Sequence, residues 1–89
     1  MKTGIELIAK ERERQIAEEG WTKEHDALHV NDELALAAVC YATPPYKDHR
    51  GSYWPWSFDW FKPSPYNRIR ELVKAGALIA AEIDRLQNK

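Results

Sequence analysis

Cysteine and long hydrophobic runs are both scarce in this sequence. Its single cysteine, Cys40, cannot form a disulfide within the chain, which suits a protein of the reducing cytoplasm. No apolar stretch approaches the ~20 residues that a membrane-spanning helix needs, and no signal-peptide pattern opens the sequence. The sequence therefore predicts a cytoplasmic protein without a membrane partner.

A large net charge is also absent. The 89 residues include 13 lysines and arginines and 14 aspartates and glutamates, which leaves a net charge of −1. Nucleic-acid binding is not expected as the main activity, because it relies on many positively charged contacts with phosphates. The length suits one small domain, 1–89, whose core would be marginal for a monomer, so we expect a homo-oligomer.

Strand signals and internal repeats are missing, whereas helix signals are strong. Thr3 and Glu6 form a capping box that predicts a helix over 4–19. Gly20 is placed to end this helix in the left-handed conformation. The middle of the helix is almost wholly polar, so we expect alternating charge, more than burial, to stabilise it.

A second helix is expected over 33–42, with Asn31 or Asp32 as its N-cap and two prolines after its end. The residues before it contain a shorter helical pattern that Thr22 could cap. Whether 22–42 forms one helix or two is left open by the pattern.

The last helix is expected over 65–86, with Ser64 as its N-cap and Pro65 at its first position. Most of its circumference is apolar, which is typical of a helix buried on two sides. Its small residues would let another helix approach closely: Ala75, Gly76, Ala77, Ala80 and Ala81. We therefore expect a bundle that a second copy of the chain completes.

The aromatic residues are concentrated between the last two helices. Nine of the ten aromatic residues and all five prolines lie between Tyr41 and Tyr66, and the prolines argue against a central strand there. The predicted fold class is all-α: a small bundle of three main helices with an aromatic, proline-rich loop insert at about 43–64.

Tryptophans in and before the insert are candidate ligand contacts. Trp54, Trp56 and Trp60, together with Trp21, could stack on a nucleotide base or another flat ligand, a contact worth ~1–3 kcal/mol. Tryptophan is also the largest hydrophobic side chain available to cap a thin, alanine-rich bundle. The tryptophans therefore have two readings, as a base platform and as a scaffold.

Two histidines and nearby carboxylates suggest a metal site. In a helix, His25, His29 and Glu33 would lie one turn apart on one face, and imidazole and carboxylate are transition-metal ligands. Asp26 stands where zinc proteases place a glutamate base. The alternative is that both histidines are capping or surface residues that flank a turn.

Carboxylates from each helix suggest a different metal. Acids that converge inside a helical bundle can hold Mg²⁺ or Mn²⁺ through oxygen ligands, and Lys74 could then contact a phosphate. The alternative is a solvated stripe of charges that pair with one another. The full set of metal candidates is Glu18, Glu19, His25, His29, Glu33 and Glu82.

Several segments together resemble a group of small phage and prophage proteins: 11–16, 19–29, 33–42, 54–56 and 72–83. Some members of that group resemble MazG-type nucleotide pyrophosphohydrolases. Those all-α oligomers use Mg²⁺ to split nucleoside triphosphates into monophosphate and pyrophosphate.

The resemblance implies a phage-type, nucleotide-binding protein that hydrolyses its ligand with Mg²⁺ or Mn²⁺. Glu33 and Asp26 would be the catalytic residues, and Lys74 and Arg70 would contact phosphate. Trp21, Trp54 or Trp56 would face the base. The alternative is a non-catalytic phage accessory protein that sequesters a nucleotide signal or binds a host protein.

The sequence also departs from the MazG pattern in two places. Asp32-Glu33 is followed three residues on by Leu36, where the pattern has an acid. On the last helix Glu82 and Asp84 are two residues apart, so they point to different faces. A complete Mg²⁺ cage therefore does not carry over residue by residue.

Overall fold

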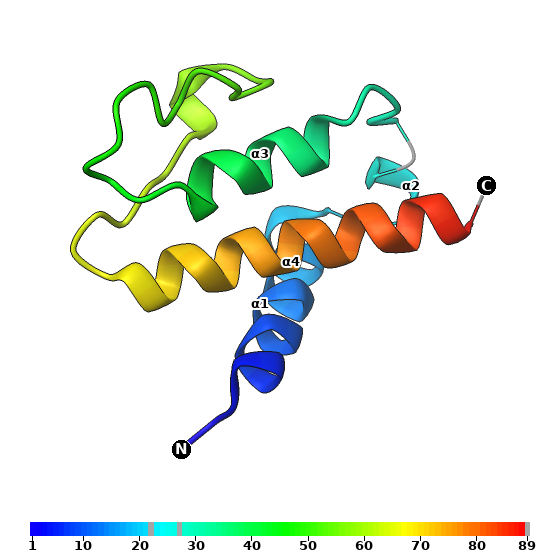
Figure 1. Cartoon of the computed structure of the whole chain (residues 1–89). Coiled ribbons are helices and arrows are strands. Elements are labelled where there is room, and N and C mark those ends of the chain that lie inside the picture. Colours follow the sequence, from blue (N-terminus) through cyan, green and yellow to red (C-terminus); the bar gives the residue numbers. More distant parts are fainter. Residues whose placement is uncertain (22, 27, 89) are drawn as a thin grey trace.

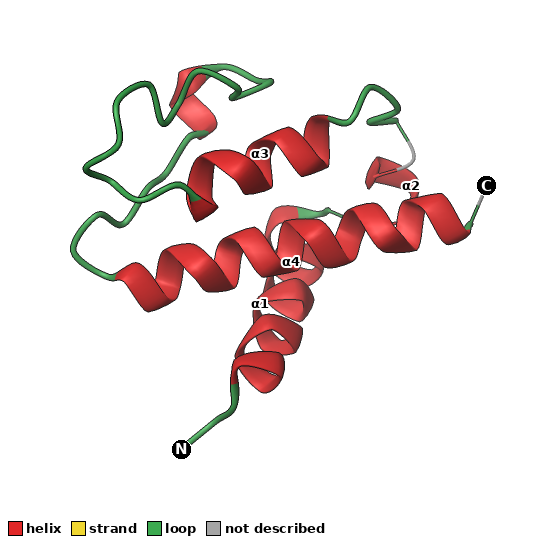
Figure 2. Ribbon diagram, in the orientation of Figure 1, coloured by secondary structure: helices red, strands yellow, loops and turns green. Residues whose placement is uncertain are grey.

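The computed structural model describes residues 1–21, 23–26 and 28–88, with Lys23 and His25 described by their backbone alone (Figure 1). Its elements follow in the order α1 (Gly4–Glu19), α2 (Lys23–Asp26), α3 (Glu33–Ala42), the 3₁₀ turn η1 (Phe58–Trp60) and α4 (Arg68–Gln87). Within the described ranges there are helices and loops but no strand (Figure 2). The expected fold class is confirmed, with α1, α3 and α4 as the main helices and the aromatic insert between α3 and α4.

The first helix has the bounds and both caps that the sequence predicts. Glu6 and Thr3 exchange the two hydrogen bonds of a capping box. Gly20 ends α1 with a φ of 69°, in the left-handed region that glycine adopts at low cost. Ion pairs of Arg14 hold the polar middle and C-terminal part of α1, although Glu11 and Gln15 are also buried. Their side chains face the rest of the molecule because α1 lies across it.

The segment before α3 forms a separate short helix, which settles the question about 22–42. The proposed cap Thr22 lies outside the described residues. Asp32 precedes α3 in a left-handed conformation, with a φ of 64° and no capping hydrogen bond from its side chain in this described part of the chain. The Glu33 carboxylate instead accepts a hydrogen bond from the Asn31 amide.

The last helix begins three residues later than predicted. Asn67, rather than Ser64, is the N-cap, and its side-chain oxygen accepts a hydrogen bond from the Arg70 amide. Ser64 cannot cap a helix at Pro65 because residues 64–67 form a turn, closed by a hydrogen bond from the Asn67 amide to the Ser64 carbonyl. The C-terminal end at Gln87 lies one residue beyond the predicted end.

The long helix α4 is the centre of the molecule. In Figure 1, α3 lies alongside α4, whereas α1 crosses it steeply. The buried core joins α3, the insert and α4, and it comprises Leu34, Ala37, Ala38, Cys40, Tyr41, Trp54, Ala75, Leu78 and Ala81. None of the helices in the described ranges is both long and apolar enough to cross a membrane.

Close approach at Gly76 lets α1 reach α4. A Cβ atom at this position would lie 2.5 Å from Cδ1 and 2.8 Å from Cγ1 of Ile8. The absent side chain therefore leaves the space that the Ile8 side chain fills. The small residues of α4 do allow close helix approach, as predicted, and one of the helices that approaches is α1 of the same chain.

A buried ion cluster ties the insert to α4. The Glu71 side chain is fully buried and pairs with Arg50 from the insert and with Arg68. It also accepts a hydrogen bond of 3.0 Å from the Ser64 amide. Arg50 and Arg68 in turn donate to the carbonyl of Thr43, just after α3. One carboxylate thus fixes both ends of the insert.

Candidate functional site

A pocket of about 760 Å³ opens between the C-terminal half of α1, the aromatic insert and the paired helices α3 and α4. It forms because α1 contacts α4 more than it contacts α3, so α1 and α3, which both flank α4, leave a wedge-shaped space between them. One wall of the pocket is mainly aromatic and the opposite wall, on α1, is mainly charged. The pocket volume lies within the range of small-molecule sites.

The aromatic wall is a set of interlocked rings. Trp54 packs edge-on against Trp56 and Tyr41, with ring centroids 5.3 and 5.5 Å apart. Its indole nitrogen donates to the Ser57 carbonyl at 3.0 Å, so Trp54 is fixed as a core residue. Trp56 is half-buried, whereas Trp60 is 67% exposed at the rim. The wall therefore has a rigid base and an exposed indole at its rim.

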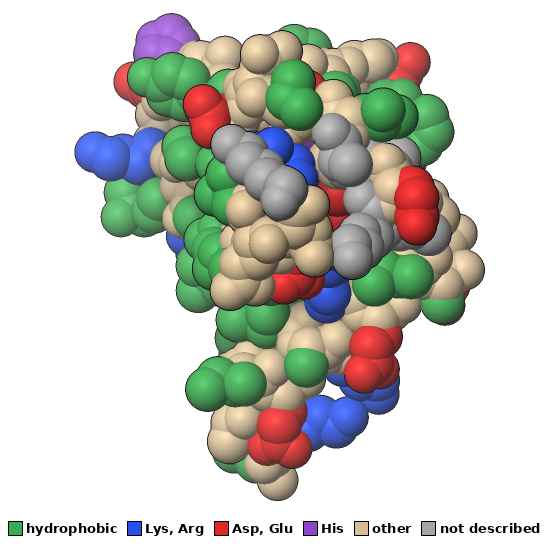
Figure 3. All heavy atoms as spheres, turned by 90° about the vertical axis from the view of Figure 1, so that its right-hand side faces the viewer, with side chains coloured by type: hydrophobic (Ala, Val, Ile, Leu, Met, Phe, Trp, Pro, Cys, Tyr) green, Lys and Arg blue, Asp and Glu red, His purple; other side chains and the backbone are tan. Residues whose placement is uncertain are grey.

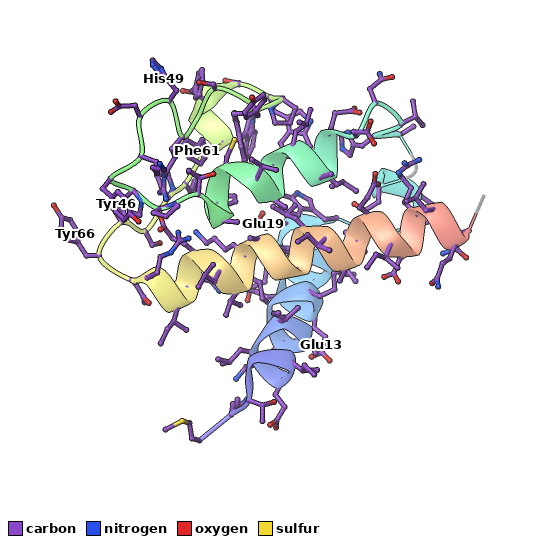
Figure 4. The ribbon with its side chains drawn as sticks, in the orientation of Figure 1. Glu13, Glu19, Tyr46, His49, Phe61 and Tyr66 are labelled. Carbon is purple, nitrogen blue, oxygen red and sulfur yellow. The ribbon has the colours of Figure 1, made fainter. Side chains whose placement is uncertain are left out.

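The α1 wall is held by the guanidinium of Arg14. Arg14 donates to Glu11 at 2.9 Å, to Glu18 at 3.4 Å and to Glu19 at 3.1 Å. The hydrogen bond with Glu11 is the main reason that the pKa of Arg14 is raised. Figure 4 shows Glu19 near the point where α1 passes behind α4, and Glu19 interacts electrostatically with Lys74 and Tyr41.

Gln15 completes the α1 wall. Its amide nitrogen donates to Glu11 at 3.1 Å, and because a carboxylate only accepts, this contact fixes which end of the amide is the oxygen. That oxygen is buried and has no hydrogen-bond partner among the described residues. The pocket wall thus holds an unused acceptor.

Lys74 brings a positive charge to the floor of the pocket. Its ammonium group donates to the Lys62 carbonyl at 2.7 Å and lies 5.4 Å from the centre of the Tyr41 ring. Burial lowers the pKa of Lys74, and the neighbouring Arg70 lowers it further. An anion bound here would offset both effects, because it would stabilise the charged form.

The pocket brings together seven of the residues that the sequence nominated: Glu18, Glu19, Trp21, His29, Trp54, Trp56 and Lys74. His29 stands edge-on to Trp56, with ring centroids 5.1 Å apart. The candidates come from α1, the loop before α3, the insert and α4, so only the fold makes them neighbours.

The remaining candidates do not line this pocket. Arg70 donates to Glu11 at 2.6 Å, and Asp26 is buried in an ion pair with Arg12 at 2.7 Å. Glu82 pairs with Arg85 at 2.6 Å. Side-chain contacts of His25 lie outside the described residues.

Glu33 interacts locally, outside the pocket. It lies 3.3 Å from Nδ1 of His29 and accepts a hydrogen bond from the Asn31 amide. Burial raises the pKa of Glu33, but these backbone and histidine contacts outweigh burial and leave the pKa lowered. The carboxylate acts here as an anchor for the loop before α3.

The proposed metal ligands whose side chains are described do not form a ready-made metal centre. Among the described side chains, which exclude that of His25, no three from His, Cys, Asp or Glu gather closely enough to hold an ion. Glu18 and Glu19 are held by Arg14, and Glu82 is held by Arg85. We therefore derive no catalytic step through Mg²⁺ or Mn²⁺.

The sequence offers Trp60 as a stacking candidate, but it does not single out several other side chains of the pocket: Glu11, Arg14, Gln15, Tyr41 and Lys62. Glu11, Arg14, Gln15 and Glu18 share one face of α1 by their spacing of three and four residues, which was the available signal. That face looked like an ordinary solvated surface because its residues are polar. Nothing in the spacing of Trp60 and Lys62 places them opposite α1.

Comparisons with models of protein families, with curated proteins and with solved structures find no match for this chain.

Proposed function

We propose that the protein binds a nucleotide, or a related small molecule with a planar ring and a phosphate group, in the pocket between α1 and the aromatic insert. The observation that carries the proposal is the joint placement of Trp60, Trp56 and Lys74 around one pocket. Planar rings stack on exposed indoles, and phosphates bind ammonium groups. Each feature alone would be ordinary, but together they match the two halves of a nucleotide.

The base would stack at the rim of the aromatic wall. Trp60 is the most exposed tryptophan of the pocket, and Trp56 is half-buried beside it. Trp54 supports them from the core and is itself too buried to offer a ring face. Stacking on one indole is worth ~1–3 kcal/mol and tolerates different bases.

The phosphate would bind at the floor, next to Lys74 and Lys62. Arg14 is less suited to this role because three carboxylates already occupy its guanidinium. Glu18 and Glu19 would accept hydrogen bonds from the sugar hydroxyls or from an exocyclic amine, since carboxylates are acceptors.

Hydrolysis is the second part of this proposal, and it rests on the MazG resemblance. The phage-type origin and the cytoplasmic location belong to the same expectation. The pocket supports binding, and the ligand set for a divalent ion is not assembled within the described ranges. Binding and turnover are therefore tested separately.

The binding test uses tryptophan fluorescence with a panel of nucleoside mono- and triphosphates. Saturable quenching of the unsubstituted protein is expected. Trp60→Ala should weaken affinity roughly 5- to 150-fold, the equivalent of ~1–3 kcal/mol. Tyr66→Ala removes a fully exposed aromatic residue that points away from the core in Figure 4 and does not line the pocket, so it should leave affinity unchanged. Absence of binding to any nucleotide at millimolar concentration would refute the proposal.

The turnover test adds Mg²⁺ or Mn²⁺ to the same nucleotides at high protein concentration. Release of pyrophosphate, abolished by Glu33→Gln, would support the hydrolytic form. Saturable binding without product would instead favour sequestration. No outcome of this second test alters the result of the first.

A further inference from the structure

An uncharged aliphatic stripe runs along the outside of α4. Five of its side chains are between 47 and 67% exposed: Ile69, Leu72, Ile79, Ile83 and Leu86. With Gly76 included, the intervals between stripe positions alternate between three and four residues, which keeps all six on one narrow strip of the helix. Figure 3, which faces the C-terminal end of α4, shows hydrophobic side chains along one flank of the molecule.

The stripe is the third apolar face of a helix whose other two faces are covered. Ala75, Leu78 and Ala81 belong to the core shared with α3. At Gly76, Ile8 of α1 packs against the edge of the stripe. A row of exposed isoleucines and leucines as long as a 20-residue helix is unusual on a monomer of this size.

We infer that a second copy of this chain covers the stripe, with the two α4 helices antiparallel. The register of the stripe supports this pairing. Reversing the helix places Ile69 opposite Leu86, Leu72 opposite Ile83, and Ile79 opposite Gly76, so that every stripe position meets another stripe position. A two-fold axis requires such self-complementarity, because both copies use the same patch.

The two central contacts of this pairing would include α1 as well as α4. Ile8 fills the space over Gly76, so Ile79 of the second copy would pack on the Ile8 side chain that covers Gly76. Lys74 and Leu78, which line the pocket, project from the opposite side of α4 because they are two residues from Gly76. The dimer therefore leaves both pockets open, and this inference does not depend on the proposed function.

The mass in solution tests the dimer. Light scattering or sedimentation equilibrium from about 10 to about 200 µM, a roughly 20-fold range, should give twice the chain mass of 10.4 kDa. Leu72→Glu and Ile83→Glu should each give the single-chain mass with an unchanged helical circular dichroism spectrum. Val39→Glu, at an equally exposed position on α3, should remain a dimer. A monomeric unsubstituted chain over this range, or Glu variants that remain dimers, would overturn the inference.

Cross-linking tests the orientation. Leu72→Cys chains mixed with Ile83→Cys chains should form a disulfide across the interface, and neither variant should do so alone. The buried Cys40 is present in all samples, and the unsubstituted chain controls for it. If each variant instead cross-links to itself, the helices are parallel and the proposed register is wrong.

Discussion

The ion cluster around Glu71 offers the sharpest test of how the insert is held. Glu71→Gln keeps the shape of the side chain and removes its charge. Arg50, whose side chain is 10% exposed, and Arg68 would then lose their carboxylate partner. The Ser64 amide would keep an oxygen acceptor, so the loss comes mainly from the two guanidinium groups.

The expected magnitude follows from burial. Removing one partner of a buried ion pair costs about 3–5 kcal/mol, because the remaining charge stays desolvated. Arg68 is 35% exposed and can regain water, so we expect the lower end, about 3 kcal/mol. For a domain of this size that corresponds to a fall in Tm of roughly 12–24 °C.

Urea unfolding followed by circular dichroism measures this loss. Glu18→Gln is the matched control, because Glu18 pairs with Arg14 on the surface, and its loss should cost at most about 0.5 kcal/mol. Tryptophan emission reports on the insert separately, since three of the four tryptophans lie in it: Trp54, Trp56 and Trp60. A loss below about 1 kcal/mol for Glu71→Gln would show that the cluster does not hold the insert.

Two further outcomes are expected. The hydrogen bond from Arg50 is the main reason that the pKa of Glu71 is lowered from 4.5. The stabilisation of the fold by the Glu71 carboxylate is therefore complete above pH 4.5 and is lost as the pH falls through the lowered pKa. Urea titrations at pH 7 and pH 3 should show this loss of stability, and Glu71→Gln should reduce the difference between the two pH values. Gly76→Ala should destabilise the fold by about 1 kcal/mol, although alanine favours helix, because its Cβ would overlap Ile8. Thermal unfolding measures this loss. Ile8→Ala in the same chain should restore the stability, and if it does not, the contact at Gly76 is not the cause.

The sequence predicts the bounds of the helices better than it predicts which residues of different segments lie in contact. The bounds of α1 follow from local chemistry, because the capping box at Thr3 and the glycine at position 20 act within one turn. The end of α3 follows from the two prolines after Thr43. The start of α4 is misplaced because Ser64 has a tertiary partner, Glu71, that no local rule reveals. Local signals therefore locate helices wherever tertiary contacts do not compete with them.

Part of the pocket could be anticipated for a different reason. Tryptophans and a lysine flanked by apolar residues are unusual in themselves, so Trp56 and Lys74 could be nominated without the fold. The buried face of α1 could not, because Glu11 and Gln15 look like solvated residues until α1 crosses α4 at Gly76. Glu82 and Asp26 lie away from the pocket, where they pair with Arg85 and Arg12.

The ends of the insert and its exposed middle make different contacts. The two ends are fixed by the ion cluster around Glu71, whereas the exposed stretch around Trp60 contributes to the pocket rim. Substitutions at Ser57, Trp60 and Lys62 can therefore change what the pocket accepts without loosening the attachment of the insert to α4. A library randomised at these three positions would sample new ligand preferences on an unchanged helical frame, which makes this small fold a convenient scaffold for selecting binders.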